Sequence, residues 1–190
     1  VGDEMFVAMS DVFLDQPECL QKLAKVFRGF EEAGSAPTLF ILMGPFLSKA
    51  SLLAGDIHKA YTSGFKELAK IVKEHSAIHN HSHLLFVPGP GDPSPLGTSL
   101  LPQPRLQPYF TQVLEESLGG PDNHNCIFAS NPCRIHHAGQ EIVIFRDDLQ
   151  NKMRRHDLSH VFQGAEAEAE DHQDDDANEG GVVMDVDKSD

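Results

Sequence analysis

Three histidines and an acidic loop are the residues whose types and spacing most directly predict chemistry in this chain. His79, His81 and His83 alternate ahead of an apolar run, which leads into the Gly-Pro-Gly-Asp loop at 89–92. In an extended segment alternate side chains share one side, so three imidazoles would be placed to bind a metal. The other interpretation is a polar, solvated approach to a strand. We prefer this second interpretation, because the sequence identifies neither a further metal ligand nor a residue that would orient the imidazole rings.

Two aspartates and an arginine are the other candidates for a site. Asp11 is either a retained metal ligand or, as we prefer, a loop residue that accepts hydrogen bonds from nearby backbone N–H groups. Asp92 precedes a proline and is predicted to form a turn. Arg134 follows the loop that begins at Asn131, and we hypothesise that its guanidinium pairs with Asp11 or Asp92.

The elements that must position these residues alternate along the chain. Apolar runs predict buried strands, and apolar residues at helical spacing predict amphipathic helices. The predicted strands are 5–9, 38–43, 84–88, 126–130 and 141–145, and the predicted helices are 17–33, 57–75, 105–118 and 147–156. Asp15, Pro17 and Glu18 predict the start of the first helix. This alternation predicts an α/β fold, a layered sheet flanked by helices and largely parallel, with its functional loops at the carboxyl ends of the strands.

Those loops have the layout of a two-metal phosphoesterase without its ligands. Such a centre needs Asp, His and Asn side chains on several strand-end loops to hold two metals. After the first strand Phe13 stands where His is needed, and after the second Pro45 follows Gly44 in place of Asp. After the third strand the loop reads Gly89-Pro90-Gly91-Asp92, with neither Asn nor His. Two isolated aspartates cannot hold a dinuclear centre, so no catalytic residue, metal or cofactor is predicted.

Three longer segments carry a resemblance to a known family. "MSDVFLDQPECLQKL", "LFVPGPGDP" and "SNPCRIHHAGQEIVIFRDDLQNKMRR" closely resemble the B subunits of DNA polymerase epsilon, over roughly residues 5–156. B subunits of replicative polymerases carry an inactivated, calcineurin-like phosphoesterase domain. The resemblance implies former metal-site positions at Asp11, Phe13, Gly44, Pro45, Gly89, Pro90, Gly91, Asp92, Asn131 and Arg134.

The resemblance also implies a role. B subunits are non-catalytic and nuclear, dock on the C-terminal zinc-binding region of the catalytic subunit, contact other replisome proteins, and bind DNA within the holoenzyme. The family also has an N-terminal OB-fold and further strands after "NKMRR", which this chain does not show, so a partial domain over 1–163 is expected. The alternatives are an active phosphoesterase that recruits His79, His81 or His83, and a direct DNA-binding module.

Charge and composition further restrict the functional classes to which the protein can belong. The formal net charge is −14, and residues 164–190 hold 11 Asp/Glu and one Lys, which predicts a disordered acidic tail. The body is only mildly acidic, which argues against strong autonomous binding to phosphate backbones. The one dense basic cluster of the body consists of Arg146, Lys152, Arg154 and Arg155. A DNA contact is the less favoured interpretation of this cluster. No apolar run is long enough to span a bilayer, and no signal peptide is visible.

The remaining His and Cys residues favour a structural interpretation. His136 and His137 are adjacent, so on a strand their rings would point to opposite sides. Cys19, Cys126 and Cys133 are odd in number and have no zinc-site spacing, which predicts free thiols in a reducing compartment.

Overall fold

The computed structural model describes residues 4–53, 55–96, 100–119, 125–137 and 139–154. The chain separates into two units, residues 1–147 and 148–190. In the second unit the described part contains helix α6 (Leu149–Arg154). The domain boundary expected at residue 163 and the acidic tail at 164–190 lie outside the described residues.

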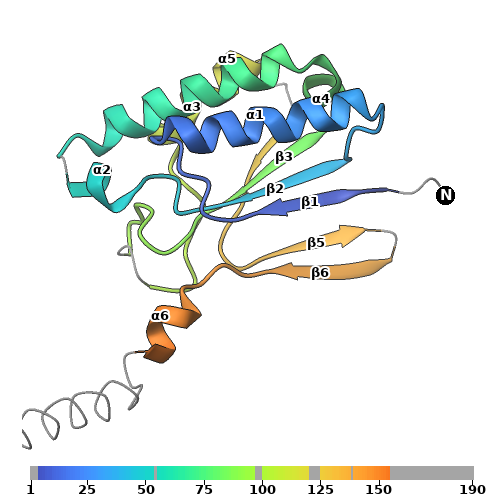
Figure 1. Ribbon diagram of the computed structural model, residues 1–190. Helices are drawn as coiled ribbons and strands as arrows, with labels where there is room; N and C mark the ends of the chain where they lie inside the picture. Colours follow the sequence, from blue (N-terminus) through green and yellow to red (C-terminus); the bar gives the residue numbers. More distant parts are fainter. Residues whose placement is uncertain (1–3, 54, 97–99, 120–124, 138, 155–190) are drawn as a thin grey trace, which may run out of the picture. The chain divides into compact units, whose positions relative to one another are not determined.

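A four-stranded parallel sheet forms the centre of the first unit (Figure 1). Its strands are β1 (Phe6–Met9), β2 (Leu39–Met43), β3 (His83–Val87) and β4 (Cys126–Phe128), in the spatial order β1-β2-β3-β4. β2 and β3 are almost continuously apolar because both faces of the sheet are covered there, as parallel sheets require. The α/β fold with a largely parallel sheet predicted from the sequence is confirmed.

Helices cover one face of this sheet (Figure 1). They are α1 (Pro17–Glu32), α2 (Lys49–Leu53), α3 (Ile57–Glu74), α4 (Ser76–His81) and α5 (Pro108–Leu118). α1 begins at a proline, which needs no N–H partner in the first turn, and it buries Leu23 and Phe27 against the sheet. Phe27 meets Phe40 of β2 edge to face, with ring centroids 5.0 Å apart.

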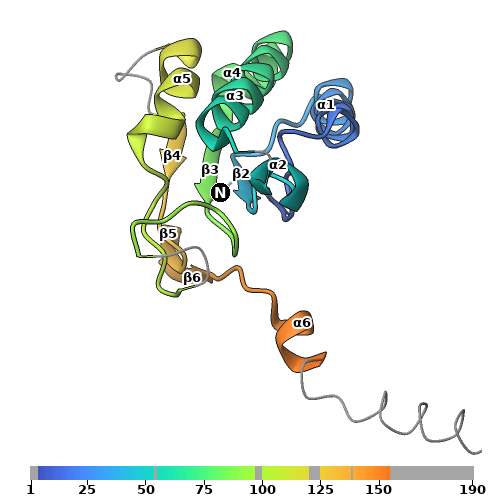
Figure 2. The same ribbon diagram turned by 90° about the vertical axis from the view of Figure 1, so that its left-hand side faces the viewer.

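A β-hairpin covers part of the other face (Figure 2). β5 (Cys133–His137) and β6 (Gln140–Ile144) pair antiparallel in a separate two-stranded sheet. Ile144 of this hairpin is buried with Ile41, Leu85 and Val87 of the main sheet. The strand expected at 141–145 is confirmed, whereas β5 was not predicted, because its exposed positions are Arg134 and His136 and its apolar content is low.

Two local expectations were wrong. The predicted start of α1 at Pro17 is confirmed, but Asp15 does not cap the helix, because Gln16 is the N-cap and makes no side-chain hydrogen bond there. The Asp15 carboxylate instead accepts hydrogen bonds from the hydroxyls of Ser48 and Ser51 at the start of α2. The segment 76–81 is helical rather than extended, since α4 follows α3 directly after His75.

Candidate functional site

The loops that follow the parallel strands meet at one edge of the sheet, as the sequence predicted. The N–H of Val12, after β1, donates to the carbonyl of Met43 at the end of β2 over 3.3 Å. The N–H of Gly44, after β2, donates to the carbonyl of Val87 at the end of β3 over 2.9 Å. These bonds continue the strand ladder beyond the strands and bring the three loops together.

Asp92 lies at the centre of this edge and is fully buried, at 0% exposure. Its Oδ1 accepts hydrogen bonds from the N–H of Phe46 at 2.8 Å and the hydroxyl of Tyr61 at 2.6 Å. Its Oδ2 accepts from the N–H of Gly89 at 2.8 Å. The turn predicted at Asp92 is therefore present, and the same carboxylate also joins the β2–α2 loop and α3 to it.

Burial dominates the ionisation of Asp92. Removal from water raises the pKa of its carboxyl to about 6, against the hydrogen bonds from Tyr61, Gly89 and Phe46, which lower it. Burial also raises the pKa of the Tyr61 phenol, helped by the neighbouring Asp92 charge. Tyr61 therefore stays protonated and acts as the donor in this pair.

Two glycines are required beside Asp92 because the backbones touch. A Cβ at Gly44 would lie 2.0 Å from Oδ2 of Asp92, and one at Gly89 would lie 2.3 Å from the carbonyl carbon of Gly44. Gly91 has φ +103°, a conformation that side-chain-bearing residues rarely adopt. The glycines of this edge therefore serve close packing and a tight turn.

Arg146, which follows β6, fills the space next to these loops. Its Nη2 donates to Oδ1 of Asp11 at 2.7 Å, and its Nε donates to the carbonyl of Gly44 at 3.1 Å. Its Nη1 donates to the carbonyl of Asp147 at 2.6 Å. The side chain of Arg146 is 16% exposed and that of Asp11 44% exposed. Asp11 itself has φ 57°, a left-handed conformation tolerated by Asp.

Asn131 holds the backbone of Arg146 in place. It is fully buried; its Oδ1 accepts from the N–H of Arg146 at 3.0 Å, and its Nδ2 donates to the Arg146 carbonyl at 2.6 Å. Its backbone pairs with Gln103 in both directions, at 2.7 and 2.8 Å. Through Gln103, whose Nε2 donates to the Asp92 carbonyl at 3.0 Å, Asn131 is linked to the buried aspartate.

The hypothesis that Arg134 pairs with Asp11 or Asp92 was wrong. Arg134 lies on β5 and pairs with Glu141 of β6 at 2.9 Å. The arginine that meets Asp11 is Arg146, which was predicted to belong to a basic cluster. The sequence signal that could have identified Arg146 was the FRDD segment, which directly follows an apolar strand. An arginine at the end of a strand can turn back toward the other strand-end loops.

The sequence of this chain matches a known protein family over most of its length. The family model for the B subunit of DNA polymerase alpha/epsilon matches residues 6–173. The chain belongs to this family. Among its relatives, the DNA polymerase epsilon subunit 2 of Mus musculus and that of Homo sapiens are each 44% identical over 153 residues. The DNA polymerase epsilon B subunit of Arabidopsis thaliana is 37% identical over 153 residues.

These relatives are much longer than the chain described here. Each match covers 80% of this chain, but only 27% of the mouse and human proteins and 28% of the Arabidopsis protein. The chain therefore spans about a quarter of the length of the relatives it matches. The family recognised from the three quoted segments is confirmed.

Phe13, Pro45 and Pro90 at the strand-end edge carry no side-chain atom that can bind a metal ion. Phe13 is half-buried, its N–H donates to the Asp11 carbonyl at 3.0 Å, and Pro45 and Pro90 have no donor atoms in their side chains. Among the described residues no group of three His, Cys, Asp or Glu side chains is placed to hold a metal.

The three alternating histidines lie at the opposite end of the sheet. His79 and His81 are on α4, and His83 is the first residue of β3, whereas the loop at 89–92 follows the last residue, Val87. Five residues of strand correspond to about 13–16 Å at roughly 3.3 Å each. The imidazoles therefore do not converge with Asp11 and Asp92, and the idea of one extended His segment was wrong.

The other His and Cys residues have structural positions. His137 pairs with Glu4 at 2.7 Å and contacts the ring of Phe6, while His136 is exposed. The expectation that the two rings point apart is confirmed. Cys19, Cys126 and Cys133 are free thiols, and burial raises the pKa of Cys126 to about 12.

The residues of the predicted basic cluster belong to different elements of the chain. Arg146 is engaged at the strand-end edge, while Lys152 and Arg154 are exposed on α6 of the other unit. Arg155 lies outside the described residues. No described helix is long and apolar enough to cross a bilayer.

Proposed function

We propose that this chain is part of a non-catalytic accessory subunit of DNA polymerase epsilon, in which a degenerate phosphoesterase site has become a structural brace. The family match and the epsilon relatives support this proposal. The observation that carries it is the state of the two aspartates at the strand-end edge. Asp92 has three internal donors and no exposure, and Asp11 is paired with Arg146.

This arrangement disfavours the alternative of an active phosphoesterase. A metal centre needs carboxylates that face a shared, accessible space and are free of competing cations. Here a guanidinium occupies one side of Asp11, and the histidines that would replace missing ligands lie at the other end of β3. We infer that the former-site positions in the strand-end loops, from Asp11 to Asn131, keep the shape of their loops but no longer hold a catalytic centre.

The role that follows is protein binding. We propose that the C-terminal region of the polymerase epsilon catalytic subunit is the principal partner, that other replisome proteins bind the same complex, and that the complex acts in the nucleus. DNA contact is proposed only within the complex, because Arg146 of the predicted basic cluster is engaged with Asp11 and Gly44.

Two measurements on the purified chain test this proposal. The chain is co-expressed with the C-terminal region of the epsilon catalytic subunit, with the corresponding region of polymerase alpha as the control, and co-purification with the epsilon region alone is expected. In parallel, hydrolysis of a model phosphodiester is assayed with Mn²⁺. Metal-dependent hydrolysis that disappears in Asp11→Ala would contradict the proposal that the phosphoesterase site is degenerate. Absence of co-purification would contradict the proposal that the epsilon catalytic subunit is the partner.

A further inference from the structure

The solvent-facing side of helix α3 carries a row of lysines. Lys59, Lys66 and Lys73 are exposed and lie seven residues apart. Seven residues are close to two full turns of an α-helix, so these side chains share one side of α3 at intervals of about 10 Å. None of the three forms an ion pair with another described residue. These three residues, called the lysine row below, are therefore available to an anionic ligand.

The charge around the lysine row restricts what that ligand can be. α3 holds more basic than acidic residues, although the whole chain has a net charge of −14. One of its two acids, Glu67, is paired with Lys70 at 2.6 Å. The adjacent helix α5 carries Glu115 and Glu116 and no Lys or Arg. A ligand of the lysine row must therefore be strongly anionic, because these carboxylates lower the positive potential beside it.

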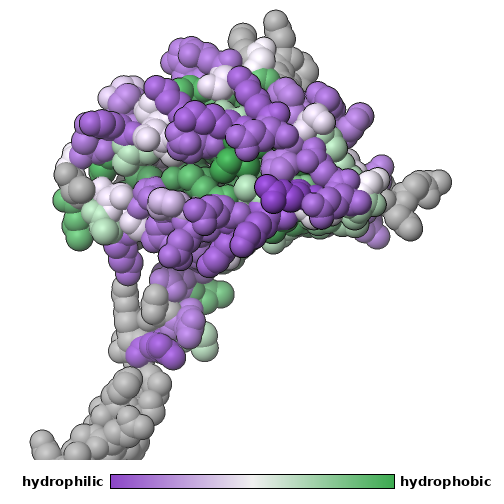
Figure 3. Space-filling view, turned by 45° about the horizontal axis from the view of Figure 1, so that its top comes forward, coloured by the Kyte–Doolittle hydropathy of each residue, from purple (hydrophilic) through white to green (hydrophobic). Residues whose placement is uncertain are grey.

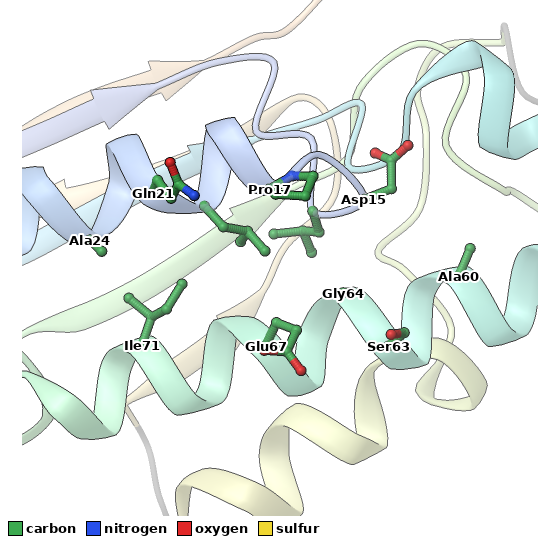
Figure 4. Close-up of a pocket in the computed structure, with 11 residues that line it drawn as sticks. Asp15, Pro17, Gln21, Ala24, Ala60, Ser63, Gly64, Glu67 and Ile71 are labelled. Carbon is green, nitrogen blue, oxygen red and sulfur yellow. The ribbon is translucent and has the colours of Figure 1, made fainter.

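The exposed surface of α3 offers no apolar anchor to a partner. Its seven exposed residues are four lysines, two glutamates and a serine. In the space-filling view hydrophilic side chains cover much of the helix layer (Figure 3). The groove between α1 and α3 lies on another side of α3, where Figure 4 shows Ala60, Gly64 and Ile71, and no Lys or Arg lines it. On the lysine row a folded protein would bury little apolar surface, whereas a phosphate backbone binds through charge alone.

An exposed aromatic ring lies beside the row where α3 begins. Tyr109 of α5 stacks on His58, with ring centroids 3.9 Å apart and planes 30° apart. Nε2 of His58 lies 3.2 Å from the carbonyl oxygen of Tyr109, and His58 directly precedes Lys59 in α3. Tyr109 is 63% exposed, more than any other described Phe or Tyr. Its ring is therefore supported by His58 but largely open to solvent, next to the first lysine.

We propose that the lysine row and Tyr109 bind single-stranded nucleic acid, with phosphates at the lysines and an unpaired base on the Tyr109 ring. Single-strand sites combine cations that follow the backbone with aromatic rings on which bases stack. The bases of a duplex are already stacked on their neighbours, so the open ring favours an unpaired strand. The inference rests on the DNA contact of the proposed complex and adds the surface and the form of nucleic acid.

Two labelled oligonucleotides of equal charge test the stacking. One is an oligothymidylate of about 12 nucleotides, and the other is an abasic strand of the same length. Fluorescence anisotropy with the purified chain at low salt is expected to give roughly tenfold weaker binding for the abasic strand. Equal affinities for the two strands, or no binding of either, would contradict the proposal. This comparison uses the native chain and does not depend on the folding of a variant.

Variants of Tyr109 assign the stacking to its ring. Tyr109→Ala should remove the difference between the two strands, whereas Tyr109→Phe keeps a ring and should retain it. Circular dichroism checks that both variants fold. A difference that persists in Tyr109→Ala would exclude this ring as the stacking surface.

A triple variant tests the lysine row. Changing all three lysines of the row to Gln should reduce the slope of log affinity against log salt by about 2, since each lost phosphate contact on a single strand accounts for about 0.7. The matched control removes three exposed cations from the neighbouring helix α1, as Lys22→Gln, Lys25→Gln and Arg28→Gln, and should leave the slope unchanged. An equal reduction in both variants would contradict a site on α3.

A glutamate peptide of the same charge separates nucleic acid from an acidic protein segment. We expect it to bind more weakly than the oligothymidylate, and binding that is as tight or tighter would overturn the proposal. If the oligothymidylate does not bind but the catalytic-subunit region co-purifies, this inference fails while the proposed function stands. If the oligothymidylate binds as expected without co-purification, the proposed protein partner fails alone.

Discussion

Arg146 and Asp11 are 135 positions apart in the sequence, yet the guanidinium donates to the carboxylate over 2.7 Å. The same guanidinium reaches the carbonyl of Gly44, after the second strand. One side chain from the end of the hairpin thus ties together the loops after β1 and β2. Hydrogen bonds between protein groups therefore hold this edge of the sheet.

Removing Arg146 should destabilise the fold more than removing Asp11. Arg146→Ala leaves two backbone carbonyls and a carboxylate without their donor, and we expect a loss of about 2–3 kcal/mol in the free energy of unfolding. Asp11→Ala should cost below about 1 kcal/mol, because Asp11 is 44% exposed and its ion pair is screened by solvent. Urea denaturation of the single and double variants gives the coupling, expected near about 0.5–1 kcal/mol. Strict additivity would contradict the pairing.

The contact between Gly44 and Gly89 should tolerate no side chain. Gly44→Ala or Gly89→Ala forces the backbones or Asp92 apart, since a Cβ would lie 2.0 Å from Asp92 and 2.3 Å from Gly44, respectively. We expect losses of at least about 3 kcal/mol for each. Gly29→Ala is the control, because its Cβ on α1 meets nothing within 4 Å. That change should stabilise the chain by up to about 1 kcal/mol, measured by thermal unfolding.

Tyr61→Phe should destabilise the chain in a pH-dependent manner. Because the folded-state pKa of Asp92, about 6, lies above its ordinary value of 3.8, the unfolded chain loses this proton first as pH rises. Ionisation of Asp92 therefore lowers stability progressively between about pH 4 and 6. The Tyr61 hydrogen bond lowers this pKa, so its removal raises the pKa and extends the loss to higher pH.

Denaturation at about pH 5 and about pH 8 measures this effect. The cost of Tyr61→Phe should be about 1 kcal/mol larger at the higher pH, where the charged form of Asp92 has lost a donor. Tyr109→Phe, at a residue that is 63% exposed, is the control and should show no such difference. A cost for Tyr61→Phe that is the same at both pH values would exclude the hydrogen bond to ionised Asp92.

Glu31 should contribute stability that acid removes. Its carboxylate accepts from Nδ1 of His75 at 2.6 Å and from the N–H of Ala77 at 3.1 Å, and these bonds hold its pKa below the ordinary value of 4.5. A depressed pKa stabilises the fold above about pH 4.5 and loses that contribution as pH falls through the folded-state pKa. The stability gap between the native chain and Glu31→Gln should therefore narrow on acidification, whereas Glu32→Gln should show no gap. A gap that stays constant from about pH 7 to about pH 3 would count against this role.

Local pattern was enough to predict most of the fold. The runs at β2 and β3 are apolar at nearly every position, and a strand covered on both faces has that composition. The apolar spacing in α1 and α3 predicted their burial because one stripe of each helix faces the sheet. β5 escaped prediction because His136 and Arg134 face solvent, so its apolar content is low.

The site was predicted in part. Strand-end position placed Asp11, Gly44 and Asp92 at one edge, and the glycines indicated sharp loops there. The partner of Asp11 was assigned to the wrong arginine, because strand order alone does not say which hairpin side chain reaches back over the edge. Tyr61 was not among the predicted site residues, although its hydroxyl donates to Asp92 at 2.6 Å, the shortest of the three side-chain and backbone hydrogen bonds to that carboxylate.

The sequence by itself determined the parallel sheet, its longer helices α1, α3 and α5, the residue types at the strand-end loops and the polymerase B-subunit family. These depend on residue type, periodicity and spacing along the chain. Only the tertiary structure decided that Arg146 braces Asp11, that Asp92 is fully enclosed, and that the histidines lie at the far end of β3. Those relationships join residues distant in the chain, and packing alone sets which of the many possible partners come within hydrogen-bonding reach.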